Sequence, residues 1–159
     1  MVVSKNEGLI MNKNSILIKT IIILLFLNLN AIAKESNFFL KGKKLYEKNK
    51  FQESKILFER DLVFNPKSEK SYLYLAKIFS QKENVEEQER NLNSVLLLNP
   101  KNDEAIYMLA LIKIKQSDYS EAKKLIDRFK LVCKNFCSKE SEMNEKLTKL
   151  TPEDAKKIN

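Results

Sequence analysis

A repeated interval constrains this 159-residue chain more than any other feature. Asn65-Pro66 recurs as Asn99-Pro100, and steps of 34 from these pairs divide the body into residues 35–68, 69–102 and 103–136. A period of 20–50 residues is typical of chains that stack one small unit several times. We therefore expect a linear stack of three similar units.

Residues of the same kind recur in register within the three intervals. The fourth and twenty-fourth places are large, the eighth is small and the seventeenth is large and apolar. In that order they hold Phe38, Tyr72 and Ile106; Phe58, Leu92 and Ile126; Gly42, Ala76 and Ala110; and Phe51, Val85 and Tyr119. Apolar spacings of three and four predict two short amphipathic helices per interval, such as residues 36–48 and 52–64. Neither helix can bury its apolar face alone, so neighbouring units must stack.

This pattern resembles the tetratricopeptide repeat (TPR) family, in three consecutive copies. The resemblance implies an all-α fold, a solenoid of three helical hairpins followed by a C-terminal capping helix, without strands. The small eighth residue would let the two helices of a pair approach closely, and the seventeenth would fill the gap at their turn. The family has small residues at the twentieth and twenty-seventh places, where this chain has Gln88, Asp61 and Phe129. These larger side chains would change the distance between neighbouring helices.

Residues 1–33 have the pattern of a secretory signal peptide. Three lysines precede the apolar run 21–27, and small residues follow it at Ala31 and Ala33. We expect cleavage after Ala33, with Met11 as an alternative start of translation. The other interpretation is an uncleaved membrane anchor, although the apolar stretch is shorter than the about 20 residues of a spanning helix.

The chain is basic, with a formal net charge of +8, and loss of three lysines and one glutamate with residues 1–33 would leave +6. The lysines are scattered, which is typical of a solvated helix face. An acidic partner or an anionic membrane surface is the alternative, whereas nucleic acid is not an expected partner of an exported protein.

Catalysis is not expected from this composition. The chain has no histidine and only two glycines, which leaves no usual base for a nucleophile and no phosphate-binding loop. Glu86, Glu87 and Glu89 are interpreted as acids near a helix start that complement its dipole. We therefore expect no enzyme activity, no metal and no cofactor.

The C-terminal part of the chain, residues 137–159, is expected to form a capping helix and a frayed tail, with an apolar stripe at Met143 and Leu147. The two cysteines, Cys133 and Cys137, are too few for a zinc site. In an exported protein they can form a disulfide, and two packed free thiols are the alternative.

The resemblance also implies a binding site, because the first helix of each pair lines the concave groove in the TPR family. The groove residues that it assigns are Phe39, Lys43, Tyr46, Lys70, Leu73, Lys77, Tyr107, Leu111 and Lys115. The aromatic and aliphatic members are expected to have no role in the core. Leu111 and Ile114 have an alternative placement beneath the capping helix. One subclass of the family binds the carboxylate tails of heat-shock chaperones through basic residues at set groove positions. In this chain Lys43 is the one basic residue at those positions, so membership of that subclass is not expected.

The sequence therefore predicts a non-catalytic protein–protein interaction module. It would be an exported TPR scaffold or adaptor of the bacterial periplasm or cell envelope that binds a peptide or partner subunit in its groove during complex assembly. The alternative is a membrane-tethered structural subunit that uses an uncleaved N-terminal anchor.

Overall fold

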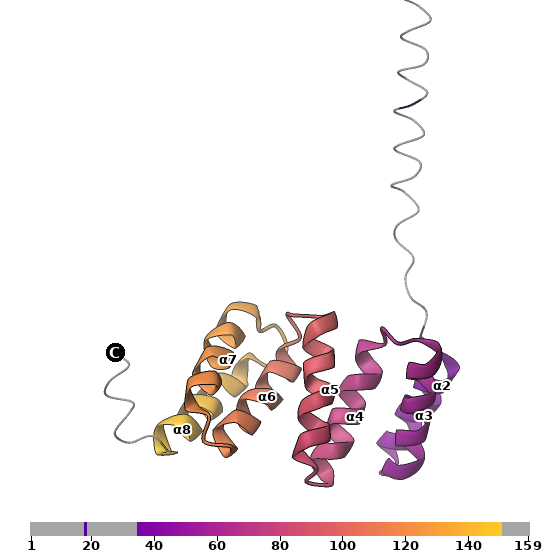
Figure 1. Ribbon diagram of the computed structural model, residues 1–159, viewed down its shortest axis with the longest axis horizontal. Helices are drawn as coiled ribbons and strands as arrows, with labels where there is room; N and C mark the ends of the chain where they lie inside the picture. The colour runs from indigo at the N-terminus through magenta and orange to yellow at the C-terminus, as the bar shows by residue number, and fades with distance from the viewer. Residues whose placement is uncertain (1–17, 19–34, 151–159) are drawn as a thin grey trace, which may run out of the picture. The chain divides into compact units, whose positions relative to one another are not determined.

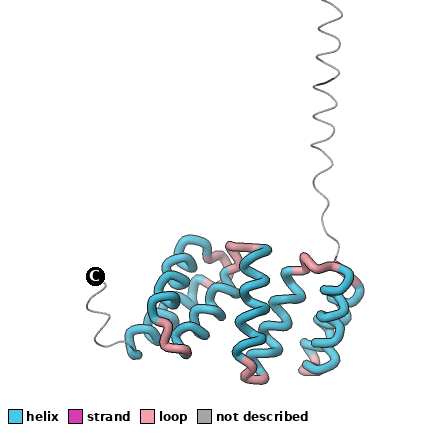
Figure 2. Tube along the Cα trace, in the orientation of Figure 1, coloured by secondary structure: helices cyan, strands magenta, loops and turns pink. Residues whose placement is uncertain are grey.

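The computed structural model describes residue 18 and residues 35–150. In chain order the helices are α2 (Asn37–Glu47), α3 (Phe51–Phe64), α4 (Glu69–Gln81), α5 (Val85–Leu98), α6 (Asp103–Lys115), α7 (Tyr119–Val132), the short 3-10 helix η1 (Cys137–Lys139) and α8 (Glu140–Leu150). The described residues contain no strand (Figure 2). The predicted all-α fold class is confirmed. The predicted signal peptide, except for residue 18, and the predicted tail after residue 150 lie outside the described residues.

The helices pair in chain order. Within the compact unit that begins at Ser36, α2 packs on α3, α4 on α5 and α6 on α7, and the pairs stack through α3 with α4 and α5 with α6 (Figure 1). The last helix, α8, covers the open end of the third pair by packing on α6 and α7, and its Met143 is fully buried. Among the described residues, no helix has the length and apolar character needed to cross a bilayer.

Small residues hold the two helices of each pair close together. Gly42, Ala76 and Ala110 are buried, as their place in the repeat predicts. A Cβ atom added at Gly42 would lie 2.9 Å from the ring of Phe58, inside normal contact distance. Phe58 is fully buried, so its ring has no free space into which it could move.

The turn inside each pair has the same backbone conformation in every repeat. Asn49, Glu83 and Ser117 have positive φ angles of 58°, 55° and 61°. The N–H of each following residue donates to a carbonyl five residues earlier, with distances of 2.9, 3.0 and 2.9 Å. These bonds are those of the Schellman motif, which ends a helix through one left-handed residue. Glycine adopts that conformation without strain, yet none of the three residues is glycine.

The core consists of two apolar clusters of different character. In the cluster between the first two pairs, the ring of Tyr74 lies 5.7 Å from Phe39, 5.0 Å from Phe58 and 5.0 Å from Tyr46. The cluster between the second and third pairs is mainly aliphatic. Its largest fully buried members are Phe129, Leu92, Ile106, Ile126, Met143 and Val95.

A buried carboxylate explains one departure from the family pattern. Asp61 on α3 is fully buried and accepts hydrogen bonds from the hydroxyls of Ser36, the N-cap of α2, and Ser71 on α4. The side chain of Asp61 is therefore tolerated in the core because both of its oxygens have hydrogen-bond donors, since a buried polar group without partners would be costly. Phe129 fills the equivalent place of the third pair as a fully buried core residue.

Ala76→Leu should destabilise the protein, because Ala76 is fully buried and the larger side chain would overpack a close helix contact. The expected loss in free energy of unfolding is about 1–3 kcal/mol. Chemical denaturation measures it, with Gln81→Leu at an exposed position of the same helix as the control. An unchanged midpoint for Ala76→Leu would contradict the close contact.

Glu83→Gly should stabilise the protein by up to about 1 kcal/mol, because glycine removes the steric cost of the left-handed conformation. Asn49→Gly is the matched control at the equivalent turn of the first pair, and it should have little effect because asparagine tolerates that conformation. Thermal unfolding of both variants checks the difference. Equal shifts in the two melting temperatures would count against this explanation.

Candidate functional site

A cleft of about 710 Å³ lies along the first helices of the three pairs. Its lining residues are Tyr46, Glu47, Tyr74, Lys77, Ser80, Gln81, Glu83, Val85, Gln88, Glu104, Tyr107, Met108, Leu111, Ile112 and Lys115. Most belong to α2, α4 and α6, which stand next to each other because their pairs stack. The cleft therefore presents aromatic and aliphatic side chains between charged ones.

The charged groups in the middle of the cleft are paired with each other. Lys77 on α4 forms a 2.8 Å ion pair with Glu104 on α6, and its Nζ lies 5.1 Å from the centre of the Tyr74 ring. Burial raises the pKa of the Tyr46 hydroxyl, and the nearby charge of Glu104 raises it further. Tyr46 is therefore neutral at physiological pH and offers an apolar ring with one polar end.

Tyr107 joins the cleft to the capping helix. Its hydroxyl donates to the carboxylate of Glu142 on α8 at 3.1 and 3.2 Å, and its ring lies 6.2 Å from that of Phe136. Lys139 donates to Glu142 at 3.0 Å and lies 5.6 Å from the centre of the Tyr107 ring. Burial raises the pKa of Tyr107, and the hydrogen bond to Glu142 adds to that effect. Tyr107 is thus both a cleft residue and a contact that holds α8.

The loop that carries Phe136 is fixed from two sides. Asp103, at the start of α6, accepts the backbone N–H groups of Lys134, Asn135 and Phe136 on one oxygen, at 2.7, 2.7 and 3.2 Å. A disulfide joins the residues that flank the loop, Cys133 and Cys137, whose Cα atoms are 5.3 Å apart. The loop that contacts the cleft residue Tyr107 through Phe136 is therefore constrained.

The middle pair has an equivalent arrangement one repeat earlier. Glu69, at the start of α4, accepts from the side-chain amides of Asn99 and Asn102 in the loop that ends its interval, at 3.0 and 2.5 Å. Asn102 in turn caps α6 by accepting the N–H of Ala105 at 2.8 Å. An acid at the first place of an interval thus fixes the loop at its end.

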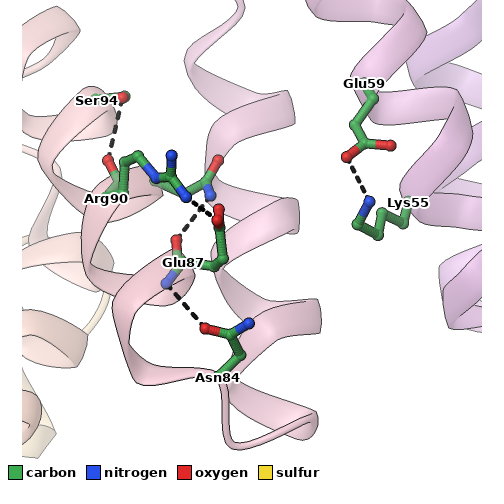
Figure 3. Close-up of polar contacts among 7 residues, drawn as sticks. Lys55, Glu59, Asn84, Glu87, Arg90 and Ser94 are labelled. Carbon is green, nitrogen blue, oxygen red and sulfur yellow. Dashed lines mark hydrogen bonds and ion pairs between the residues drawn. The ribbon is translucent and has the colours of Figure 1, made fainter.

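Two acids near the start of α5 have polar partners, and Figure 3 shows those of Glu87. The side chain of Asn84 accepts the N–H of Glu87 at 3.1 Å, and Glu87 forms an ion pair with Arg90. Glu89 accepts from Lys113 at 2.5 Å, and this hydrogen bond lowers the pKa of Glu89. The two acids with described partners, Glu87 and Glu89, thus engage neighbouring helical residues.

The structure brings five of the nine predicted groove residues into the cleft: Tyr46, Lys77, Tyr107, Leu111 and Lys115. Lys43 and Lys70 are exposed but do not line it, and Leu73 is half-buried against the aliphatic cluster. The prediction that the apolar groove residues have no role in the core is wrong. Phe39 is only 3% exposed, because its ring packs against Phe58 and Tyr74.

Tyr107 and Leu111 also pack against the aliphatic cluster while they line the cleft. Ile114 is buried as a member of the aliphatic cluster and does not line the cleft. The prediction missed Tyr74 and Met108, which occupy the sixth place of successive intervals. Their separation of 34 residues, one full repeat, is the sequence feature that could have placed both of them in the cleft.

Asp103→Asn should destabilise the protein by about 1–3 kcal/mol at neutral pH, because the neutral amide keeps only one oxygen, which cannot accept both the three loop N–H groups and the N–H of Glu104. Burial alone would raise the pKa of Asp103, but its backbone hydrogen bonds outweigh burial and lower it below 3.8. The contribution of the ionised group is therefore complete above that value and is lost as the pH falls through the lower pKa of the folded state.

Denaturation of the wild type and the variant across pH tests this assignment. The difference should shrink below about pH 4. Asp127→Asn is the control, because Asp127 is an exposed residue in a 3.6 Å ion pair with Lys130 and should change stability little. If the stability difference between the wild type and Asp103→Asn stayed the same at the lowest pH, the role of the ionised carboxylate would be refuted.

No protein-family model and no curated protein matches the chain. Solved structures do match. A tetratricopeptide repeat protein from Parabacteroides merdae aligns with a TM-score of 0.65 and 21% identity over 72% of this chain and 44% of its own. The first TPR of Spaghetti (RPAP3), bound to the HSP90 peptide SRMEEVD, aligns with a TM-score of 0.62 and 19% identity over 74% of this chain and 90% of its own.

A third match is the Yersinia enterocolitica type III secretion chaperone SycD in complex with a peptide of the translocator YopD. It aligns with a TM-score of 0.66 and 12% identity over 79% of this chain and 99% of its own. At these identities the likeness is one of fold. The chain has the fold of the tetratricopeptide repeat proteins, a solenoid of three helical hairpins with a capping helix.

Proposed function

We propose that the chain is a non-catalytic interaction module that binds a peptide or partner subunit in the cleft along α2, α4 and α6. The observation that carries this proposal is the cleft itself, which extends over three stacked pairs and has apolar and aromatic walls. Tyr46, Met108 and Leu111 offer apolar surface, and side chains of this kind commonly dominate binding energy. Two structural neighbours with the same fold, the RPAP3 domain and SycD, hold peptides.

The charges of the cleft favour an apolar segment over an acidic tail. Its central cation, Lys77, is already paired with Glu104 at 2.8 Å. Of the places that grip acidic tails in one branch of the family, only Lys43 is basic, and it lies outside the cleft. Glu47 and Lys115 at the margin can fix the direction of a bound segment, because charged groups at a rim give orientation and steer association.

The proposed setting is the bacterial periplasm or cell envelope, where the module would act as a scaffold or adaptor in complex assembly. The signal-peptide pattern of residues 1–33 supports export, and the disulfide between Cys133 and Cys137 fits an oxidising compartment. A membrane-tethered structural subunit is the second candidate. N-terminal sequencing separates them: Lys34 as the first residue supports export, and Met1 or Met11 supports tethering.

A pair of serine substitutions tests the cleft. Ser80→Trp places a large ring inside the cleft without removing a packed side chain. Ser94→Trp makes the same change in a separate hollow along α5, next to Arg90 (Figure 3). Once cross-linking in the native envelope has identified a partner, we expect Ser80→Trp to weaken its binding by about tenfold or more. Titration calorimetry measures the affinity, and circular dichroism verifies the fold of both variants.

Ser94→Trp should bind the partner like the wild type. The opposite result, with binding lost in Ser94→Trp and retained in Ser80→Trp, would move the working site to the outer helices. Loss of affinity in both variants with an intact fold would equally refute a site confined to the cleft.

A further inference from the structure

A row of exposed apolar side chains follows the same period as the core. Val63, Leu97 and Leu131 occupy the twenty-ninth place of the three intervals and are 75%, 83% and 86% exposed. They lie in the last turns of α3, α5 and α7, which all end on the same side of the stack because successive helices run antiparallel (Figure 1). We call these three residues the apolar row. Exposed apolar residues that gather in one region mark interaction sites more often than single ones do.

Three lysines accompany the apolar row. Lys67, Lys101 and Lys134 are exposed in the loops that directly follow α3, α5 and α7, and they form no side-chain ion pair with the described residues. We call them the lysine row. Glu69 and Asp103, at the starts of α4 and α6, are hydrogen-bonded to asparagine amides and N–H groups of these loops. These two acids therefore have partners of their own, while the side chains of the lysine row are exposed.

The chain also enters the stack at this side. Ser36, the N-cap of α2, bonds to Asp61 near the end of α3, and the ring of Phe38 stacks on that of Phe64 at 5.6 Å. Phe64 is itself 73% exposed next to Val63. In the sequence, the apolar run 21–27 ends nine residues before Ser36.

These features suit one kind of surface. Apolar side chains in a row, bordered by lysines, match the acyl boundary and the anionic headgroups of a bilayer. A nucleic acid would engage the lysines but leave the apolar row exposed. A symmetric contact with a second copy would bring two lysine rows together, which is electrostatically unfavourable.

We propose that this side of the stack rests on an anionic lipid bilayer, with the apolar row at the boundary between headgroups and acyl chains and the lysine row on the lipid phosphates. This contact is distinct from the cleft, which is lined mainly by the first helices of the pairs. The molecule can then hold a protein partner in the cleft while its second helices end at the membrane.

The absence of tryptophan from the chain makes the contact measurable. Leu97→Trp and Leu131→Trp, each in the full chain, place a single fluorophore in the apolar row. Ile56→Trp is the matched control, because Ile56 is 52% exposed on α3 but lies two turns before the row. The probes are vesicles of phosphatidylglycerol with phosphatidylcholine, vesicles of phosphatidylcholine alone, and the anionic mixture with brominated acyl chains.

We expect the emission of Leu97→Trp and Leu131→Trp to shift to the blue with anionic vesicles and to be quenched by brominated lipid, while Ile56→Trp changes little. Replacing Lys67, Lys101 and Lys134 with glutamate in the reporter variants should reduce the quenching severalfold, and high salt should weaken it because screening weakens surface charge attraction. Far-UV circular dichroism verifies that each variant is folded.

Three results would overturn the proposal. The first is cosedimentation with anionic vesicles without any change at residues 97 and 131, since the N-terminal sequence alone would then account for binding. The second is an equal change at residue 56. The third is a blue shift without vesicles that grows with protein concentration, which would make a second copy of the chain the occupant.

Discussion

The close approach of the two helices in each pair is the contact on which the rest of the structure depends. At Gly42 the partner ring of Phe58 occupies the space that a side chain would need, and Ala76 and Ala110 allow the same approach in the other pairs. Each pair then acts as one unit with an apolar face on either side. Stacking buries these faces and brings the first helices next to one another, so the cleft is a consequence of how the core is packed.

The two junctions between pairs are built from different chemistry. At the junction of the first and second pairs, the ring of Tyr74 packs against those of Phe39 and Phe58. At the junction of the second and third pairs, most of the packed side chains are aliphatic. Tyr74 also lines the cleft, and so does Tyr107, which bonds to the capping helix. The side chains that would meet a partner are therefore continuous with those that hold the stack together.

The sequence predicted the features that depend on spacing. The period, the helix pairs and the small eighth place followed from residue types at fixed intervals, because core packing repeats with the backbone. Features that depend on one particular neighbour were not predictable in this way. The burial of Phe39 depends on Tyr74 of the next pair, and the buried Asp61 depends on two serines, one on either side of it in sequence.

The cleft illustrates the same division. Lys77 and Leu111 were identified because their place in the repeat faces the groove, while Lys43, at the equivalent place of the first pair, does not reach it. Within residues 35–150 no helix pair precedes the first one, so its equivalent residue does not meet the same surroundings. The sequence also left the pairing of Cys133 and Cys137 open, and only the path of the loop after α7 brings them together.

The left-handed turn that recurs in every repeat bears on how such a chain can change in evolution. Each interval ends its first helix within its own residues, and the second and third also fix their last loop with their own first acid. Duplication or deletion of one whole repeat would therefore leave the helices and turns of the other repeats at the same places in their intervals. The side chains at a junction are matched to one neighbour only, aromatic at one and aliphatic at the other. A copied repeat would therefore need substitutions at its new junction before the side chains there could pack as closely as those of the original junctions.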